Sequence, residues 1–202
     1  MLNDVIAVVA AYLLGCVQTG YYLVRASTGQ DLRSMGSGST GARNAGRVLG
    51  RKGFVLTLLG DIGKGALAVV ISRWLETSPI TVTAALVAVM MGHVWPVQLG
   101  FSGGRGIAVG LGSLAVFDFR LLGILALVTL LVYAVTRRFQ AGGVAGFAAL
   151  PFAAWFIHLP REAVAGILCM SIIILFAHRS HIVRWVRPTL ELGNEPAVKQ
   201  ED

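Results

Sequence analysis

The sequence predicts an all-α integral membrane protein, a single bundle of about seven transmembrane helices. Hydrophobic residues make up 55% of the 202 residues, charged residues only 13%, and the mean hydropathy is +0.73. An ordinary soluble domain carries about a quarter charged residues. The apolar residues gather in seven segments, several of which approach the roughly 20 residues that a helix needs to cross a bilayer. These observations together place the chain in a membrane.

The first apolar segment covers residues 5–24. Acidic Asp4 precedes it, and it lacks the basic region with which a cleavable signal peptide begins. We therefore expect this segment to be the first membrane span.

Six further apolar segments follow, at residues 53–72, 80–99, 107–117, 121–136, 142–157 and 163–177. The fourth and fifth of the seven are short, so we expect them to be thin, tilted or joined as a re-entrant pair. The 25 glycines favour close contacts between membrane helices. We expect residues 1–190 to form one polytopic membrane domain, and the polar residues 191–202 to form a disordered cytoplasmic tail.

The basic residues indicate how the chain is oriented. With alternating spans, one set of connections carries 13 arginines and lysines, whereas the opposite set carries only Arg73, Arg120 and Arg161. The positive-inside rule then places the N terminus outside and the C terminus in the cytoplasm. We expect a multi-pass protein of the plasma membrane, with its polar patches facing the cytoplasm.

The net charge of +7 does not indicate nucleic-acid binding. The basic residues lie beside apolar spans without an aromatic stacking face, so orientation and contact with anionic lipids explain them. The two cysteines, Cys16 and Cys169, have no metal-like spacing and are expected to be small buried hydrophobic residues. The sequence predicts no metal ion and no cofactor, it predicts the lipid bilayer as a partner, and it identifies no protein partner.

The first of three polar, glycine-rich patches covers residues 36–44 and begins Gly36-Ser-Gly-Ser-Thr-Gly41. It matches the dinucleotide pattern G-x-G-x-x-G, but a polar stretch precedes it and no βαβ pattern follows, so we reject that interpretation. Glycines still allow backbone N–H groups to converge on an anion, and Ser37 and Ser39 add hydroxyl donors. A flexible loop with orienting arginines remains the alternative.

The second patch, residues 60–65, places Asp61 and Lys64 one helical turn apart inside an apolar segment. Each charge alone would cost roughly 2.5 to 3.5 kcal/mol at the centre of a membrane helix, so the two are expected to neutralise one another. Either a functional pair or a buried structural ion pair fits this pattern. The patch is not a nucleotide-binding P-loop, because Lys64 is followed by glycine.

The third patch, residues 92–106, contains Gly92-His-Val-Trp-Pro96 and Gly103-Gly-Arg-Gly106. Three features predict a phosphate-binding site here: the free N–H groups at the start of the next helix, the positive end of its dipole, and Arg105. His93 is a candidate general base or hydrogen-bond donor, with a structural role as the alternative.

Taken in order, these patches and a final His178-x-x-x-Ile182-x-Arg184 resemble the bacterial acyl-phosphate-dependent glycerol-3-phosphate acyltransferases, the PlsY family. The resemblance covers nearly the whole chain. It implies a seven-helix membrane enzyme that moves a fatty acyl group from acyl phosphate to the 1-hydroxyl of glycerol 3-phosphate, giving lysophosphatidic acid for phospholipid synthesis.

The resemblance also implies the site. By resemblance, the catalytic residues are His93, Arg105 and Ser37. The residues implied to bind substrate and phosphate are Gly36, Gly38, Ser39, Gly41, Asn44, Arg47, Asp61, Lys64, Gly103, Gly104, Gly106, His178, His181 and Arg184.

Four positions depart from the family pattern: Ser39 and Arg43 in the first patch, Arg105 where the family carries lysine, and His181 where it carries asparagine. Arginine replaces a compact point charge by a planar fork, so the substrate phosphate would be held differently. Arg43 is expected either to recruit a larger anion or to pair with Asp31. A family member with another acceptor, or with no activity, is therefore one alternative.

The chemistry favours an acyl phosphate donor. The mixed anhydride is already activated, so the protein has mainly to orient two substrates and stabilise negative charge, and a substrate phosphate oxygen can accept the hydroxyl proton. No aspartate stands five residues after any of the four histidines, which argues against acyltransferases that use an H-x-x-x-x-D dyad with thioester donors. A transporter for an anionic substrate is a further alternative, because broken helices and buried charges also occur there.

Overall fold

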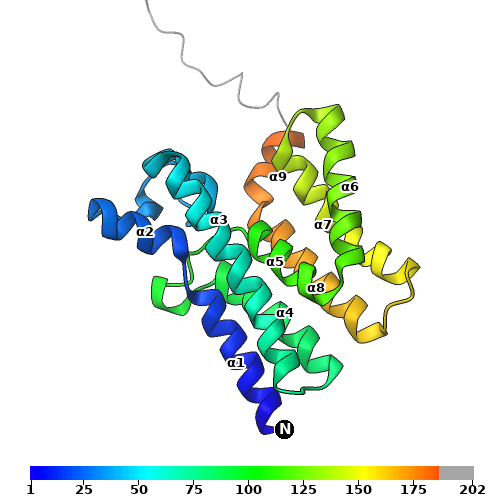
Figure 1. Cartoon of the computed structure of the whole chain (residues 1–202). Helices are drawn as coiled ribbons and strands as arrows, with labels where there is room; N and C mark the ends of the chain where they lie inside the picture. The colour runs from blue at the N-terminus through cyan, green and yellow to red at the C-terminus, as the bar shows by residue number, and fades with distance from the viewer. Residues whose placement is uncertain (187–202) are drawn as a thin grey trace, which may run out of the picture.

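The computed structural model describes residues 1–186, apart from the side chains of residues 184 and 186; the tail expected at residues 191–202 lies outside this part. Within this part of the chain, every element of secondary structure is a helix (Figure 1). Its α-helices are α1 (Leu2–Cys16), α2 (Thr19–Thr28), α3 (Ala42–Trp74), α4 (Pro79–Val94), α5 (Ile107–Phe117), α6 (Phe119–Thr136), α7 (Phe139–Phe156), α8 (Arg161–Ala177) and α9 (Arg179–Val186). Two short 3-10 helices, η1 (Leu32–Ser34) and η2 (Val97–Leu99), lie in the connections.

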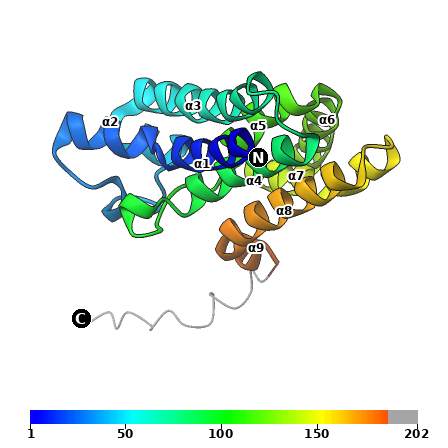
Figure 2. The same cartoon turned by 90° about the horizontal axis from the view of Figure 1, so that it is seen from below.

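The helices pack as one bundle, with α1 on α4, α3 on α5, α6 on α7, and α8 against both α4 and α7 (Figures 1 and 2). Its centre is apolar and includes Leu86, Met90, Phe147 and Ile174, all fully buried. Many large apolar side chains on the outside are exposed, as expected of a surface that faces lipid.

Small residues allow the close contact between α1 and α4. A Cβ built at Gly92 would lie 2.1 Å from the carbonyl oxygen of Tyr12, and one at Gly15 would lie 2.2 Å from that of Val89. Either substitution would force the two backbones apart, which is why membrane helices that meet this closely use glycine.

Five helical stretches of the described chain are long and apolar enough to cross a membrane: Leu2–Thr28, Ala42–Trp74, Pro79–Leu99, Phe119–Thr136 and Phe139–Phe156. Helix α5, with 11 residues, is a shorter apolar helix, as the sequence indicated. Helix α8 has 17 residues. The coarse prediction of an all-helical membrane protein is confirmed, and the count of seven spans stays a prediction.

Two helices differ from the segments that the sequence predicted. The first segment is divided at Val17 and Gln18, where α1 ends and α2 begins. Helix α3 begins 11 residues before the apolar segment at residue 53, and it kinks at Gly50, whose φ is 64°. Positive φ is open to glycine at little cost, so the helix changes direction there.

Candidate active site

A pocket of about 330 Å³ opens at the end of the bundle where α4 and α8 terminate. We call it the active-site pocket. Two loops line it: the first loop, residues 35–41, leads into α3, and the second loop, residues 95–106, joins α4 to α5. The junction of α8 and α9 completes the wall. The lining residues are Ser37, Gly38, Ser39, Val94, Trp95, Phe101, Ser102, Gly103, Gly104, Arg105, Phe176, Ala177 and Arg179.

Asn44 holds the first loop in shape. Its side-chain amide donates to the carbonyl oxygens of Leu32, Met35 and Ser39 at 2.9 to 3.1 Å, and its Oδ1 accepts from the N–H of Ser37 at 3.0 Å. Gly36 has a φ of 54°, and a Cβ there would lie 2.3 Å from Asn44 Oδ1. Asn44 was predicted to bind substrate, and the structure places it beneath the loop, fully buried.

Gln18 ties both loops to the break between α1 and α2. Its side-chain amide donates to the carbonyl oxygens of Gly15 and His93, and its Oε1 accepts from Thr40 at 2.6 Å. The N–H of Thr40 in turn donates to the carbonyl oxygen of Gly103 at 3.4 Å. Sequence reasoning missed Gln18; its signal is a polar amide side chain within the first apolar segment.

Arg105 reaches from the second loop to the first loop and to α9. Its guanidinium donates to the carbonyl oxygen of Ser37 at 3.5 Å and to Nε2 of His181. Gly106, with a φ of 87°, is the N-cap of α5, so Arg105 stands directly before the positive end of that helix. The structure therefore brings together Ser37, Arg105 and His181, which lie far apart in the sequence.

His93 does not line the pocket. Its ring is buried behind the second loop, where a Cβ built at Gly104 would lie 2.1 Å from His93 Nε2. The hydrogen of Gly104 is therefore all that fits between the loop and the imidazole. Gly104 was predicted to bind the substrate phosphate; in the structure the side on which a Cβ would stand faces His93.

Asp61 and Lys64 also lie behind the pocket. Both are buried, and Lys64 Nζ is 2.9 Å from Asp61 Oδ1 and donates to the carbonyl oxygen of Val17 at 2.6 Å. His93 Nδ1 is 3.8 Å from the same carboxylate oxygen, too far for a hydrogen bond. The ion pair thus joins α3 to the break between α1 and α2, rather than facing the pocket.

The C-terminal motif contributes differently at each position. His178 is buried, and its Nδ1 donates to the carbonyl oxygen of Ile174 at 2.9 Å. Burial lowers the pKa of His178 below its ordinary value, so the ring is neutral at pH 7. His181 stacks on Trp185 with ring centroids 6.1 Å apart. Arg184 lies in α9, but its side chain lies outside the described part of the chain.

Arg179 is the basic residue that the sequence analysis missed. It lines the pocket, and its guanidinium lies over the Phe176 ring at 4.3 Å. In the sequence it was one of the 13 basic residues that indicate the orientation of the chain. Its position directly after His178 is the signal that could have identified it.

The other predicted residues border the first loop. Ser39 lines the pocket, and its Oγ accepts from the N–H of Gly41 at 3.3 Å. Arg47 is exposed on α3, with its Cδ 3.5 Å from the Cβ position of Gly36. Arg43 is also exposed. Asp31 pairs with Arg33 at 2.7 Å, so the pairing with Arg43 that the sequence left open is not the one that forms.

Comparison with known proteins points to one family. A family model described as glycerol-3-phosphate acyltransferase matches residues 5–188. Glycerol-3-phosphate acyltransferase 1 of Desulfitobacterium hafniense is 46% identical over 179 residues, 89% of each chain. The glycerol-3-phosphate acyltransferase of Geobacter sulfurreducens is 40% identical over 185 residues, 91% of this chain and 94% of the relative.

Two solved structures share the fold. One is PlsY, an integral membrane glycerol 3-phosphate acyltransferase, in its glycerol 3-phosphate form. It superposes with a TM-score of 0.84 at 27% identity, over 95% of this chain and 99% of that one. The lysophosphatidic acid form of PlsY gives a TM-score of 0.81 at 25% identity, over 92% of each chain.

Proposed function

The chain belongs to the glycerol-3-phosphate acyltransferase family, and on that basis we propose that it transfers a fatty acyl group from an acyl phosphate to the 1-hydroxyl of glycerol 3-phosphate. The product is lysophosphatidic acid. Similarity to PlsY structures in glycerol 3-phosphate and lysophosphatidic acid forms supports both the acceptor and the product. The donor is our own inference from the chemistry of the chain.

The observation that carries this proposal is the composition of the active-site pocket. Two cations, Arg105 and Arg179, stand among glycines and serines on a pocket that also has aromatic walls. Guanidinium groups and backbone N–H groups are the donors that bind phosphate in proteins, and Arg105 adds the positive end of α5. The aromatic walls, which include Trp95 and Phe176, suit the start of an acyl chain.

In the proposed reaction the 1-hydroxyl oxygen of glycerol 3-phosphate attacks the acyl carbon. The bond between that carbon and the phosphate oxygen breaks, and inorganic phosphate leaves. The described residues that line the pocket include no histidine, aspartate or glutamate. We therefore assign the hydroxyl proton to a phosphate oxygen of a substrate, with Arg105 stabilising the negative charge that develops.

Ser37, His93 and the buried ion pair receive distinct roles in this proposal. Ser37 borders the substrate phosphate, because its carbonyl oxygen contacts Arg105 and it lines the pocket. His93 is a positioning residue that supports Gly104 from behind. Asp61 and Lys64 fix the break between α1 and α2, from which Gln18 holds both loops.

We further propose seven spans, formed by α1 with α2 and by each of α3 to α8. The 13 basic residues on one set of connections support a cytoplasmic active-site pocket and an external N terminus. The pocket lies at the ends of α4 and α8, whereas an alternating-access site lies near the midplane. This position supports an enzyme rather than a transporter.

The donor can be tested with purified protein. We expect acyl phosphate and glycerol 3-phosphate to give lysophosphatidic acid and inorganic phosphate in equal amounts. Acyl-CoA or acyl carrier protein, freed of acyl phosphate, should give no product. Turnover with purified acyl-CoA would refute the donor, and turnover of acyl phosphate with another acceptor but not with glycerol 3-phosphate would refute the acceptor.

A further inference from the structure

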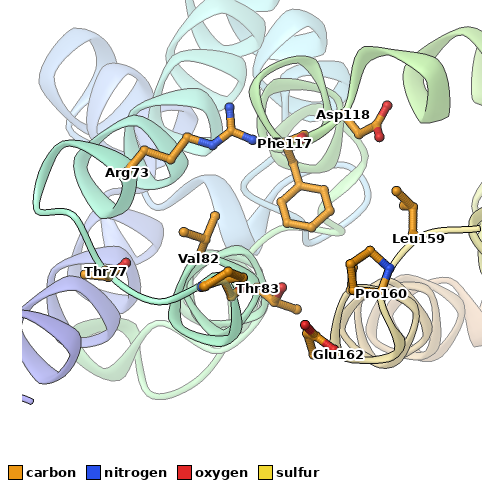
Figure 3. Close-up of a pocket in the computed structure, with 11 residues that line it drawn as sticks. Arg73, Thr77, Val82, Thr83, Phe117, Asp118, Leu159, Pro160 and Glu162 are labelled. Carbon is orange, nitrogen blue, oxygen red and sulfur yellow. Dashed lines mark hydrogen bonds between the residues drawn. The ribbon is translucent and has the colours of Figure 1, made fainter.

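A second pocket, of about 280 Å³, opens at the opposite end of the bundle (Figure 3). We call it the far pocket. Helix α3 ends beside it, α4 and α8 begin beside it, and α5 ends there. It is lined by Arg73, Thr77, Pro79, Val82, Thr83, Phe117, Asp118, Leu159, Pro160, Glu162 and Ala163. None of these residues belongs to the active-site pocket.

The far pocket lies at the other face of the membrane. Helices α4 and α8 both start at the far pocket and end at the active-site pocket, and they have 16 and 17 residues. At 1.5 Å per residue, each spans about 25 Å, close to the thickness of the hydrocarbon core.

Aromatic side chains at this end place the far pocket at the level of the lipid headgroups. Trp74 at the end of α3 is 78% exposed, and Phe119 at the start of α6 and Phe156 at the end of α7 are each 76% exposed. Tryptophan is enriched at the boundary between hydrocarbon and water, and Trp74 stands at such a helix end. A phospholipid can therefore reach the pocket with its headgroup.

The far pocket presents opposite charges on opposite sides. Figure 3 shows Arg73 on one side and Glu162 on the other, with Phe117 between them. Among the described residues, neither Arg73 nor Glu162 forms a salt bridge, whereas Asp118 pairs with Arg120 at 2.6 Å. Arg73 donates to the carbonyl oxygen of Phe117 at 2.9 Å, which fixes its guanidinium at the rim.

The charge pattern selects the kind of headgroup. Arg73 forms the anion side of the pocket, and Glu162, in the first turn of α8, lies on the opposite side. Glu162 supplies a carboxylate for a cation. We propose that the far pocket binds the headgroup of a zwitterionic phospholipid, with the phosphate at Arg73 and an ammonium group, as in phosphatidylethanolamine, at Glu162.

The apolar part of the wall fits the rest of such a lipid. Phe117 lies between the two charges in Figure 3, and Val82 and Leu159 line the same pocket; together they offer an apolar surface for the glycerol and the first acyl carbons. An anionic lipid without the ammonium group would satisfy Arg73 but leave Glu162 facing an uncharged group. Preference for the zwitterionic headgroup therefore depends on Glu162, and binding of either lipid depends on Arg73.

Native mass spectrometry of the purified, detergent-solubilised protein tests the proposal. The ligands to be titrated are phosphatidylethanolamine, phosphatidylglycerol of the same acyl chains, and soluble phosphoethanolamine. The proteins to be compared are the parent chain, Arg73→Gln, Glu162→Gln and the matched control Arg161→Gln. Arg161 is an exposed neighbour of Glu162 that does not line the pocket. Acyl transfer at the active-site pocket checks that each variant is folded.

We expect one saturable phosphatidylethanolamine site that binds at least about tenfold more tightly than phosphatidylglycerol, because both charges are used. Arg73→Gln should weaken the binding of both lipids, Glu162→Gln should abolish the preference between them, and Arg161→Gln should match the parent. Equal binding of the two lipids by the parent, or unchanged binding in both pocket variants, would overturn the proposal. Phosphoethanolamine that binds as tightly as the lipid would make this a site for a soluble molecule instead.

Discussion

Gly104 packs against the imidazole of His93 so closely that a Cβ at Gly104 would lie 2.1 Å from Nε2. The ring is buried on the side of the second loop that faces away from the active-site pocket. The contact therefore sets the position of the loop that carries Arg105. We therefore expect His93 to affect activity through the position of this loop, without touching the substrate.

Substitution of Gly104 by alanine should disturb the loop through His93. Overpacking of this kind costs about 1 to 3 kcal/mol, so Gly104→Ala should lower the melting temperature and raise the KM for glycerol 3-phosphate. His93→Ala in the same chain removes the atoms with which the new methyl group collides. The double variant should recover part of both losses, as a double-mutant cycle can measure. Additive losses would show that Gly104 acts independently of His93.

The buried Asp61–Lys64 pair should behave as a structural unit. Lys64→Met leaves an unpaired carboxylate and Asp61→Leu an unpaired ammonium, and removal of one partner of a buried pair costs about 3 to 5 kcal/mol. Either single variant should melt well below the parent in detergent, and the Asp61→Leu, Lys64→Met double variant should melt above both. Single variants that retain the parental melting temperature would contradict a structural role.

Arg105 and His181 should depend on one another, because the Arg105 guanidinium donates to His181 Nε2. Lysine at position 105 keeps the charge but cannot span both His181 and the carbonyl oxygen of Ser37 as a planar fork does. The Arg105→Lys, His181→Asn double variant carries the pair found in the family pattern. Its kcat/KM should exceed that of Arg105→Lys alone. A double variant that is no better would show that the two positions are not coupled.

Cysteine labelling in intact cells tests the orientation. In a chain with Cys16→Ala and Cys169→Ala, we expect Ser34→Cys to react only with reagents that enter the cytoplasm and Glu76→Cys to react with impermeant reagents from outside. Both positions are exposed; Ser34 ends η1, ahead of α3, and Glu76 lies just after the end of α3. Labelling of both from one side would contradict the proposed topology.

The sequence predicted the helices well and their ends poorly. Apolar segments identify membrane helices because each must bury its backbone polar groups in hydrocarbon. The break at Val17 and Gln18 escaped notice, since it rests on contacts with distant residues such as Lys64 and Thr40. The early start of α3 escaped as well, because its first turns are polar.

The sequence also identified most residues of the site, but not which of them line the pocket and which lie behind it. It grouped His93, Asp61 and Lys64 with the pocket because they are costly beside lipid, and they do gather near it. Hydrophobic pattern cannot say which side of a loop a side chain supports, so these three residues appeared as part of the pocket rather than behind it. Arg179 was not identified, because in the sequence it looks like any other basic residue that orients the chain in the membrane.

The central claim is that Arg105 and the glycine loops seat the phosphate of glycerol 3-phosphate. Steady-state kinetics of lysophosphatidic acid formation by Arg105→Ala tests it most directly, with Lys52→Ala, which removes an exposed cation from α3, as the matched control. A charge-assisted contact to phosphate contributes more than the roughly 1 kcal/mol of a neutral hydrogen bond, so kcat/KM should fall by more than about tenfold. The control should keep the parental value, and Arg105→Lys should lie between. A folded Arg105→Ala variant with parental kcat/KM would place the phosphate elsewhere and contradict this account.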